Sequence, residues 1–154
     1  MVPQPNRKMQ SLLEGRLGRD PLTARQRSEL MGRIRSKDTK PEMIVRRLVH
    51  GMGYRYRLHV KELPGCPDLV FRPRRKVIFI HGCFWHRHTG CAANRLPTTR
   101  REFWRHKLDG NVRRDRQNEE TLEEMGWRVM VVWECEMKDL DHLANEVKGF
   151  LGPR

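Results

Sequence analysis

The sequence predicts an α/β fold in which one mixed β-sheet is flanked by helices. Two apolar runs with the length of a buried strand lie at 76–81 and 127–133. Between them, residues 99–126 carry apolar side chains at helical spacing. A further helix-like segment at 39–52 comes before the strand-like segments. This succession of elements is typical of a single sheet covered by helices.

Length and charge limit the kind of protein. A chain of 154 residues suits one well-buried domain and is short for two. Its 32 basic residues, mostly arginines, face 19 acidic ones and give a formal net charge of +13. Because arginine favours planar contacts with phosphate, a polyanionic partner is the leading interpretation. A solvated basic surface and an anionic membrane are the alternatives, and no stretch approaches the ~20 apolar residues of a membrane span.

The N-terminal segment, residues 1–24, is predicted to be a flexible basic arm. It is either a disordered tail or a segment that becomes ordered on a nucleic acid. It has no apolar region of the kind found in secretory signals. We therefore expect a cytoplasmic protein, in which the four cysteines are metal ligands or free thiols rather than disulfides.

Two helices are predicted after the arm. Residues 25–37 fit a short basic helix. Its apolar stripe consists of Leu30, Met31 and Ile34. The second helix is predicted to begin at Thr39 with a capping box completed by Glu42, and to end at Gly51 or Gly53.

Three short strands are expected next, at 54–59, 68–71 and 76–81. The first alternates in polarity, and the second follows a proline-rich turn. The third is nearly all apolar, as in a central strand that is covered on both faces.

The C-terminal third is predicted to contain helix, strand and helix. The long helix should begin near Thr99 with a capping box at Glu102, and Gly110 weakens its middle. Its buried side would consist of Phe103, Trp104, Leu108, Val112, Leu122 and Met125. Residues 127–133 read as another buried strand, and 138–150 as a closing helix.

Residues 77–91 combine a strand-like run with three histidines, two cysteines and two adjacent aromatic residues. Three of these side chains, in the spacing Cys-x4-His-x2-Cys, together with a cysteine near the C-terminal strand, suit a closed tetrahedral zinc site. These four candidates are Cys83, His88, Cys91 and Cys135. Sets that use Cys66, His81 or His86 are alternatives, and so are buried cysteines that bind no metal.

A second candidate metal site centres on Asp68. It begins one strand, and a hairpin can bring it beside His81 at the end of the next. Carboxylate oxygen suits Mg²⁺, and a histidine without a metal, here His81 or His86, can act as a general base or acid near neutral pH. Glu42 is a further oxygen candidate, or else only a capping-box glutamate. A Pro-Asp pair is otherwise most often a turn or cap.

Exposed aromatic and basic side chains are candidates for nucleic-acid contacts. Phe84 and Trp85 lie in the loop that is crowded with metal-binding residues, which favours exposure over a place in the core, whereas Trp104 could equally anchor its helix. Phosphate contacts are expected from Arg113, Arg114 and Arg116, unless they form only a solvated helix face.

Six motifs together resemble one known family. They are Lys37-Asp-Thr-Lys-Pro-Glu42, Leu63-Pro-Gly-Cys-Pro-Asp68, Val77-Ile-Phe-Ile-His-Gly-Cys-Phe-Trp-His86, Thr99-Arg-Arg-Glu-Phe-Trp104, Asn111-Val-Arg-Arg-Asp-Arg116 and Gly126-Trp-Arg-Val-Met-Val-Val-Trp-Glu-Cys135. Over residues 28–137 the chain resembles the very-short-patch-repair (Vsr) DNA mismatch endonucleases. The resemblance implies a restriction-endonuclease-like core. It also implies Mg²⁺-dependent nicking of one DNA strand, 5′ to the thymine of a T·G mismatch left by deamination of 5-methylcytosine.

The resemblance also implies roles for single residues. Asp68 matches the metal-binding aspartate, His86 the catalytic histidine, His81 an assisting histidine and Glu42 the helix glutamate. Ile80 stands where the family usually has threonine, and its backbone carbonyl remains a possible Mg²⁺ ligand. The zinc ligands match Cys83, His88, Cys91 and Cys135. The aromatic residues that intercalate beside the mismatch match Phe84, Trp85 and Trp104, and a residue that wedges from the other groove matches Met31.

This chain departs from the wider pattern in two places. One extra residue lies between Cys83 and Cys91. The wider nuclease class carries a lysine on the strand that here reads Ile-Phe-Ile-His, so the histidines would have to replace that lysine.

The predicted function is a Mg²⁺-dependent, zinc-stabilised nickase that acts as a monomer on double-stranded DNA at T·G mismatches. Residues 25–154 would form its single catalytic domain, and mismatch-repair proteins are possible partners. A restriction-type or homing-type cutter of paired DNA, and a non-catalytic zinc-containing DNA-binding module, are the alternatives.

Overall fold

The structure, a computed structural model, describes residues 22–34 and 36–154. The helices are α2 (Ala24–Gly32), α3 (Lys40–Gly51), α4 (Arg101–Glu124) and α5 (Leu140–Leu151). The strands are β1 (Arg57–Leu58), β2 (Leu69–Phe71), β3 (Lys76–His81) and β4 (Arg128–Trp133). Short 3-10 turns lie at Arg72–Arg74, Ala92–Asn94 and Glu134–Lys138. The predicted arm lies outside the described residues as far as residue 21.

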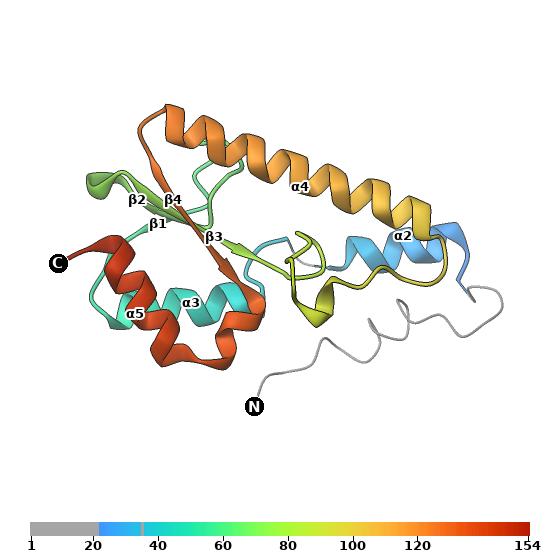
Figure 1. Cartoon of the computed structure of the whole chain (residues 1–154), viewed down its shortest axis with the longest axis horizontal. Coiled ribbons are helices and arrows are strands. Elements are labelled where there is room, and N and C mark those ends of the chain that lie inside the picture. The colour runs from blue at the N-terminus through green and yellow to red at the C-terminus, as the bar shows by residue number, and fades with distance from the viewer. Residues whose placement is uncertain (1–21, 35) are drawn as a thin grey trace.

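The four strands form one mixed sheet in the order β1-β2-β3-β4 (Figure 1). The β1–β2 and β2–β3 pairs are antiparallel, and β3 pairs with β4 in parallel. The long helix α4 connects the two parallel strands, as a crossover of this kind requires. The predicted α/β class with a mixed sheet is therefore confirmed.

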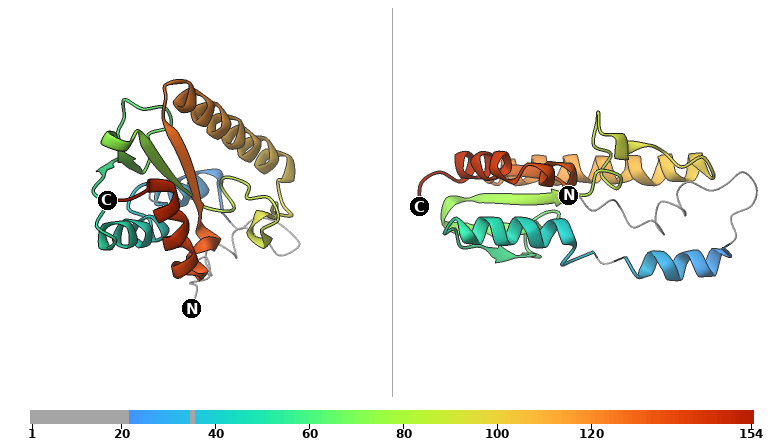
Figure 2. Two further views of the ribbon diagram at one scale, coloured as in Figure 1. Left: turned by 60° about the vertical axis from the view of Figure 1, so that its left-hand side comes forward. Right: turned by 90° about the horizontal axis from the view of Figure 1, so that it is seen from below.

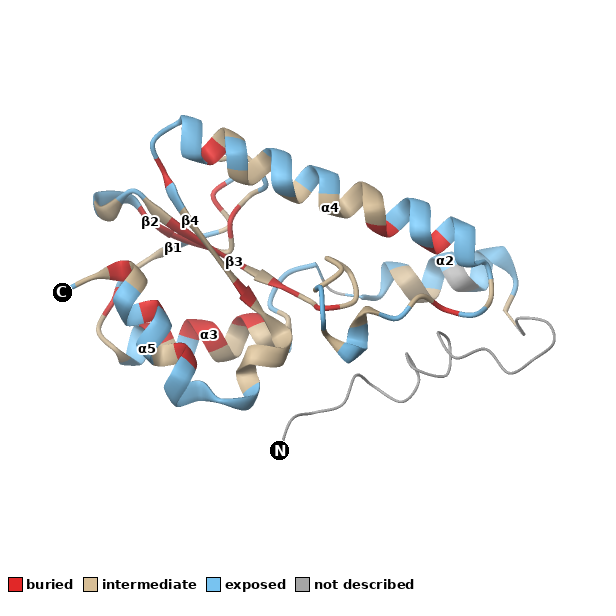
Figure 3. Ribbon diagram, in the orientation of Figure 1, coloured by how far each residue is buried: buried red, intermediate tan, exposed pale blue. Residues whose placement is uncertain are grey.

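Helices cover both faces of the sheet (Figures 1 and 3). Because side chains alternate along a strand, Leu69 and Phe71 pack with α3 and α5 in one core, whereas Val70 between them faces the other. That second core contains Leu122 of α4 and Trp127. The molecule thus has three layers, with α4 on one side of the sheet and α3 and α5 on the other.

The two apolar runs take different places in the sheet. β3 lies between β2 and β4, and most of its side chains are buried, as expected for a central strand. β4, predicted as another buried strand, lies at the edge, and most of its side chains are only half-buried. An apolar run indicates a strand next to a core, but it does not reveal whether both edges of that strand are paired.

The ends of α2 and α4 differ from the predictions. Helix α2 begins at Ala24 with a capping box from Thr23, and it ends at Gly32, so Ile34 lies beyond it and is exposed. Arg100 takes the N-cap of α4 in a left-handed conformation with φ 52°. No side chain caps that end, so the predicted Thr99 capping box is wrong.

The long helix α4 is continuous through Gly110. Although glycine weakens the middle of a helix, it does not interrupt this one. Trp104, Leu108 and Leu122 form its buried side. Phe103 and Met125, which were predicted to be buried, are 45% and 44% exposed. Helical spacing alone therefore places too many residues on the inner face of a helix whose N-terminal half extends past the sheet (Figure 1).

The parallel pairing of β3 and β4 brings the segments that follow both strands to the same end of the sheet. His81 at the end of β3 pairs with Trp133 at the end of β4, so the loop after β3 and the turn after β4 leave the sheet together. Figure 2 shows α2 and the first half of α4 extending past this same end of the sheet in different planes. Among the described residues, no helix has the length and apolar character needed to cross a membrane.

Candidate active site and metal centre

The β2–β3 hairpin brings Asp68 beside the end of β3. The backbone N–H of Ile80 donates to Asp68 Oδ2 at 2.7 Å across the pair. Burial raises the pKa of Asp68 to about 6, against the opposing effect of this hydrogen bond. A carboxylate whose charge is disfavoured by burial gains stability from a nearby cation, so the residue suits a metal ligand.

Several predicted residues line one cleft of about 290 Å³ at this end of the sheet. Asp68, Ile80, His81 and His86 all contribute to its wall. Glu42, the remaining predicted catalytic residue, is buried behind it and is only 2% exposed. The structure thus gathers the candidate metal ligand and both candidate histidines around the same space.

The two histidines lie face to face. Their ring centroids are 3.8 Å apart, and the ring planes differ by 7°. His81 is buried, and this burial, together with nearby His86, lowers its pKa to about 4. His81 is therefore neutral at physiological pH, and its ring supports the more exposed ring of His86.

His86 has a carboxylate partner from a distant element. Its Nδ1 lies 2.6 Å from Oδ2 of Asp115 on α4. A carboxylate at Nδ1 favours the tautomer that carries its proton there, which leaves Nε2 able to accept one. Such an arrangement is what a general base needs.

Sequence reasoning missed Asp115. In the sequence it is one acidic residue among Arg113, Arg114 and Arg116 on a predicted helix. That pattern indicates a solvent-exposed carboxylate paired with a neighbouring arginine. The structure turns it inward, and it lines the cleft. Four residues earlier on the same helix, the Asn111 side chain donates to the backbone carbonyl of Trp85 at 3.0 Å and so ties α4 to the loop that carries His86.

Glu42 belongs to a buried charged group that the sequence did not reveal. Its backbone N–H is capped by Thr39 Oγ1 at 3.4 Å, but its carboxylate contacts Arg46 and lies 2.7 Å from His59 Nε2. His59 Nδ1 in turn lies 3.8 Å from Asp68 Oδ1. The Glu42 carboxylate therefore does not complete the predicted capping box, because it faces Arg46 and His59 instead, and His59 links it to the cleft.

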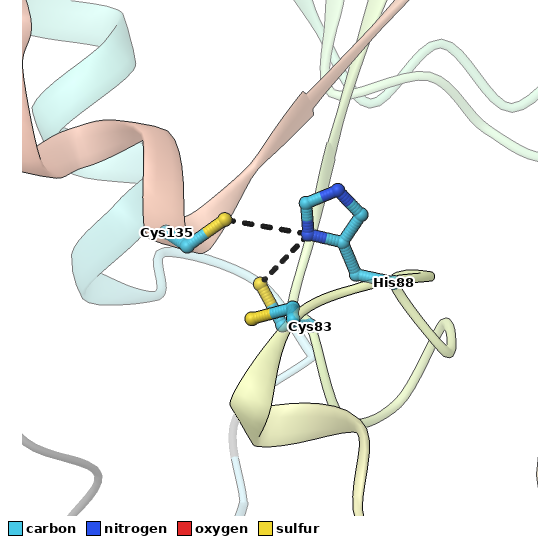
Figure 4. A group of neighbouring side chains, drawn as sticks. Cys83, His88 and Cys135 are labelled. Atoms are coloured by element: carbon cyan, nitrogen blue, oxygen red, sulfur yellow. Dashed lines mark hydrogen bonds between the residues drawn. The ribbon is translucent and has the colours of Figure 1, made fainter.

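The four cysteine and histidine candidates form a second cluster. One ligand atom from each of Cys83, His88, Cys91 and Cys135 lies within 4.8 Å of all the others. His88 Nδ1 is 3.6 Å from the sulfur of Cys83 and 3.3 Å from that of Cys135 (Figure 4). The ring of Trp133 stacks on His88 with centroids 4.2 Å apart. The loop after β3 and the turn after β4 therefore supply the ligands together.

The chemistry of this cluster fits zinc. Burial raises the pKa of Cys83 to about 12 and also raises the pKa of Cys135. Thiols that resist ionisation to this degree need a bound cation if they are to become thiolates. Three sulfurs and one imidazole are a common structural zinc set. The three alternative residues, Cys66, His81 and His86, lie outside the cluster and line the cleft instead.

The aromatic candidates form a third group beside the cleft loop. The ring centroids of Phe84 and Trp85 are 5.1 Å apart, and Trp104 lies 5.7 Å and 6.0 Å from them. Trp104 is buried and anchors α4, whereas Phe84 and Trp85 are half-buried. Met31 lies on α2 and is not part of this group.

The three arginine candidates share the exposed face of α4. Arg113, Arg114 and Arg116 are all exposed there, and the Arg114 side chain donates to Asn111. The structure therefore places them on the helix that also supplies Asp115, and none of them lines the cleft.

Comparison with known proteins gives a family match. The family model for DNA mismatch endonuclease Vsr matches residues 19–92 of this chain. That range contains Asp68, the three histidines of the cleft wall and three members of the cysteine–histidine cluster, while Asp115 and Cys135 lie beyond it.

Three curated relatives match over most of their lengths. The chain is 49% identical over 134 residues to the type II nicking enzyme V.XorIIP of Xanthomonas oryzae pv. oryzae, which covers 87% of this chain and 98% of the relative. It is 42% identical over 136 residues to the type II nicking enzyme V.NmeAIP of Neisseria meningitidis, with 84% and 96% covered. It is 44% identical over 120 residues to DNA mismatch endonuclease Vsr of Escherichia coli, with 78% and 76% covered.

Proposed function

Because this chain belongs to the Vsr family of DNA mismatch endonucleases, we propose that it nicks one strand of duplex DNA 5′ to the thymine of a T·G mismatch. The chain is an endonuclease, since its relatives are named for mismatch cleavage and nicking. The observation that carries the proposal is the cleft in which Asp68 and the His86–Asp115 pair share one wall.

Asp68 and the backbone carbonyl of Ile80 would hold Mg²⁺. The fit rests on the buried carboxylate, whose pKa is raised to about 6 and whose charged form a cation would stabilise. When bound, Mg²⁺ supplies positive charge to the phosphate and orients water. Glu42 supports this arrangement from behind, through His59.

The attacking water gives its proton to Nε2 of His86. As the new oxygen–phosphorus bond forms, the bond from phosphorus to the 3′ oxygen breaks, and solvent supplies the proton that this oxygen takes up. Asp115 stabilises the positive charge that develops on the imidazole, which is how a carboxylate partner strengthens a histidine base. Neutral His81 holds the ring of His86 by stacking and would donate a hydrogen bond to the scissile phosphate.

Mismatch selectivity is assigned to the aromatic group beside the cleft. Inserting Phe84 and Trp85 into a base step costs a few kcal/mol of stacking, and that cost is smallest where a mismatch has already weakened the duplex. Trp104 supports both rings from α4. Met31 on α2 would wedge from the other groove, and the exposed arginines of α4 would contact phosphates.

Zinc would be held by Cys83, His88, Cys91 and Cys135, and it would fix the loop that carries His86 to the end of β4. We further propose that residues 25–154 form one restriction-endonuclease-like domain. We expect it to act as a monomer and to hand nicked DNA to mismatch-repair proteins. The mixed sheet, with a carboxylate at the start of a hairpin strand, supports the proposed fold.

The proposal is tested with duplexes that differ at one base pair. Protein is incubated with Mg²⁺ and T·G, T·A or C·G duplexes, each labelled on one strand at a time. Nicking of only the thymine strand of T·G is the expected result, and Asp68→Asn should abolish it. Trp85→Ala should reduce the preference for T·G over T·A.

Equal cleavage of T·A or C·G duplexes would instead favour a nicking enzyme that acts on paired DNA. Two relatives are named as type II nicking enzymes without reference to a mismatch, which makes this the specific alternative. Binding without any cleavage would reject both activities.

A further inference from the structure

The candidate cleft is poor in positive charge, although the protein as a whole carries a net charge of +13. Three carboxylates, from Asp68, Asp115 and Glu119, line it. Among the described residues of its wall, Lys37 is the single side chain with a permanent positive charge. A phosphodiester that enters this space needs cationic partners, because each carboxylate repels it.

We propose that Lys37 is a further catalytic residue, which contacts a non-bridging oxygen of the scissile phosphate. This inference rests on the proposed function, since it assigns a role in cleavage of DNA at the same cleft. It also revises the sequence-based expectation that the histidines of β3 and its loop stand in for the lysine of the wider nuclease class. A histidine has no permanent charge near neutral pH, whereas a lysine ammonium does.

The fold holds Lys37 in place through its neighbour. Asp38 has a left-handed backbone with φ 55°, which turns the chain between α2 and α3. The Asp38 carboxylate accepts a hydrogen bond from Nη1 of Arg46 at 2.7 Å, and the Arg46 side chain is only 9% exposed. A buried guanidinium thus ties the segment next to Lys37 to α3.

The same guanidinium connects this segment to the rest of the site. Arg46 also pairs with Glu42, and its Nη2 lies 2.8 Å from His59 Nε2. His59 lines the cleft beside Asp68. Lys37 therefore reaches the cleft from a segment that is joined to the same buried group as the candidate metal ligand, and not from an independent loop.

An ammonium at this position would act mainly in the transition state. Negative charge grows on the non-bridging oxygens as water adds to phosphorus, and a fixed cation stabilises that growth. Removing one such contact commonly slows the chemical step by about 10²-fold or more, while binding changes little. A surface lysine that only attracts DNA would instead change affinity and its salt dependence.

The test compares Lys37→Ala and Lys37→Arg with Lys40→Ala in the full chain. Lys40 is the matched control, because it is an exposed lysine in the first turn of α3 that does not line the cleft. Each variant is saturated with T·G duplex, and the nicking rate is measured in a single turnover. Duplex affinity is measured separately without Mg²⁺, and melting temperature and zinc content check folding.

We expect Lys37→Ala to slow single-turnover nicking by about 10²-fold and Lys37→Arg to recover part of that loss, since a planar cation replaces the ammonium imperfectly. Lys40→Ala should change the rate by about twofold or less, because an exposed charge outside the cleft is screened. Phosphorothioate substitution at the scissile phosphate gives a second readout. Sulfur in place of one non-bridging oxygen should slow Lys37→Ala less than it slows the wild type.

Three outcomes would overturn the assignment. They are equal rates for Lys37→Ala and Lys40→Ala, a loss of affinity in Lys37→Ala with no change in the bound rate, and equal sulfur effects in wild type and Lys37→Ala for both diastereomers. Failure of the proposed function is distinguishable, because it would appear in the wild type as the absence of T·G nicking.

Discussion

Asp115 and His86 come from different elements and are joined by a 2.6 Å contact between carboxylate and imidazole. Both side chains remain partly accessible, at 21% and 27%, so the imidazole can meet water from the cleft. If this pair is the catalytic base, its activity depends on the charge of Asp115 and not only on its shape.

Asp115→Asn is therefore expected to slow single-turnover nicking by about 10²-fold to 10³-fold, within the range that a general base contributes. The amide keeps the size of the side chain but does not stabilise an imidazolium. Glu123→Gln, an exposed change on the same helix, is the control. Rates that are alike in the two variants would remove Asp115 from the mechanism, and melting temperatures should agree with the wild type in both.

Asp68 makes stability depend on pH. Its folded-state pKa of about 6 lies above the value of about 4 for an unfolded aspartate, so the folded state holds the proton more tightly. The resulting stabilisation is fully present below pH 4 and is lost as pH rises through 6. At pH 7.5 the ionised carboxylate should cost on the order of 2 kcal/mol in Mg²⁺-free protein.

Asp68→Asn should consequently raise the melting temperature of Mg²⁺-free protein at pH 7.5, and the gain should shrink toward pH 4. Addition of Mg²⁺ at pH 7.5 should stabilise the wild type more than the variant, because the ion needs the carboxylate. The measurement is a thermal melt across this pH range with zinc retained. A variant that is less stable than the wild type at pH 7.5 would contradict the sign.

At the scale of elements, patterns in the sequence predicted those helices and strands whose apolar side chains recur at a regular spacing. The apolar run of β3 and the spacing of α3 and α4 correspond to real elements. The Thr99 capping box predicted for α4 was wrong because Arg100, in a left-handed conformation that its residue type does not predict, takes the N-cap. The edge position of β4 was missed because pairing partners are set by the whole sheet.

The candidate site divides in the same way. Asp68, His81 and His86 were found because they lie at the ends of strand-like runs or in the unusual loop after one. Asp115 and His59 were missed because each looks ordinary among its sequence neighbours, and only the tertiary structure brings it to the cleft. The position of Lys37 in the cleft wall was missed for the same reason, because a lysine in a basic segment of a very basic chain looks ordinary.

Three members of the cysteine–histidine cluster lie in the first half of the loop after β3, and the fourth, Cys135, follows β4. Cys135→Ser is expected to reduce bound zinc from about one equivalent and to lower the melting temperature, because three ligands hold zinc less firmly than four. Cys66→Ser is the matched control, as that cysteine lies outside the cluster. Metal analysis after dialysis gives the readout, and wild-type protein with less than about half an equivalent of zinc would reject the site.

At the scale of the whole molecule, the net charge of +13 predicts DNA binding that weakens steeply with salt. The arginines of α4 should account for part of this dependence. The double variant Arg113→Gln and Arg116→Gln is expected to reduce the slope of log K against log salt by about 2, since each phosphate contact contributes roughly 0.9.

The control for this experiment changes two exposed lysines in and beside α5, on the other side of the sheet. Lys138→Gln with Lys148→Gln removes the same charge at positions that face away from α4. If both double variants lower the slope equally, binding follows overall charge, and the α4 face has no special role.

The loop between β3 and α4 carries both the candidate general base and three candidate zinc ligands within a few residues. His86 lies between Cys83 and His88 in the sequence, and its backbone N–H bonds to the carbonyl of Gly82. A change that moves His86 would also disturb the two zinc candidates on either side of it, whereas the one extra residue between Cys83 and Cys91 leaves the four candidate ligand atoms within 4.8 Å of one another. We therefore expect differences in target preference to lie in other segments, such as α2 and the exposed face of α4, where a substitution leaves both groups of side chains in place.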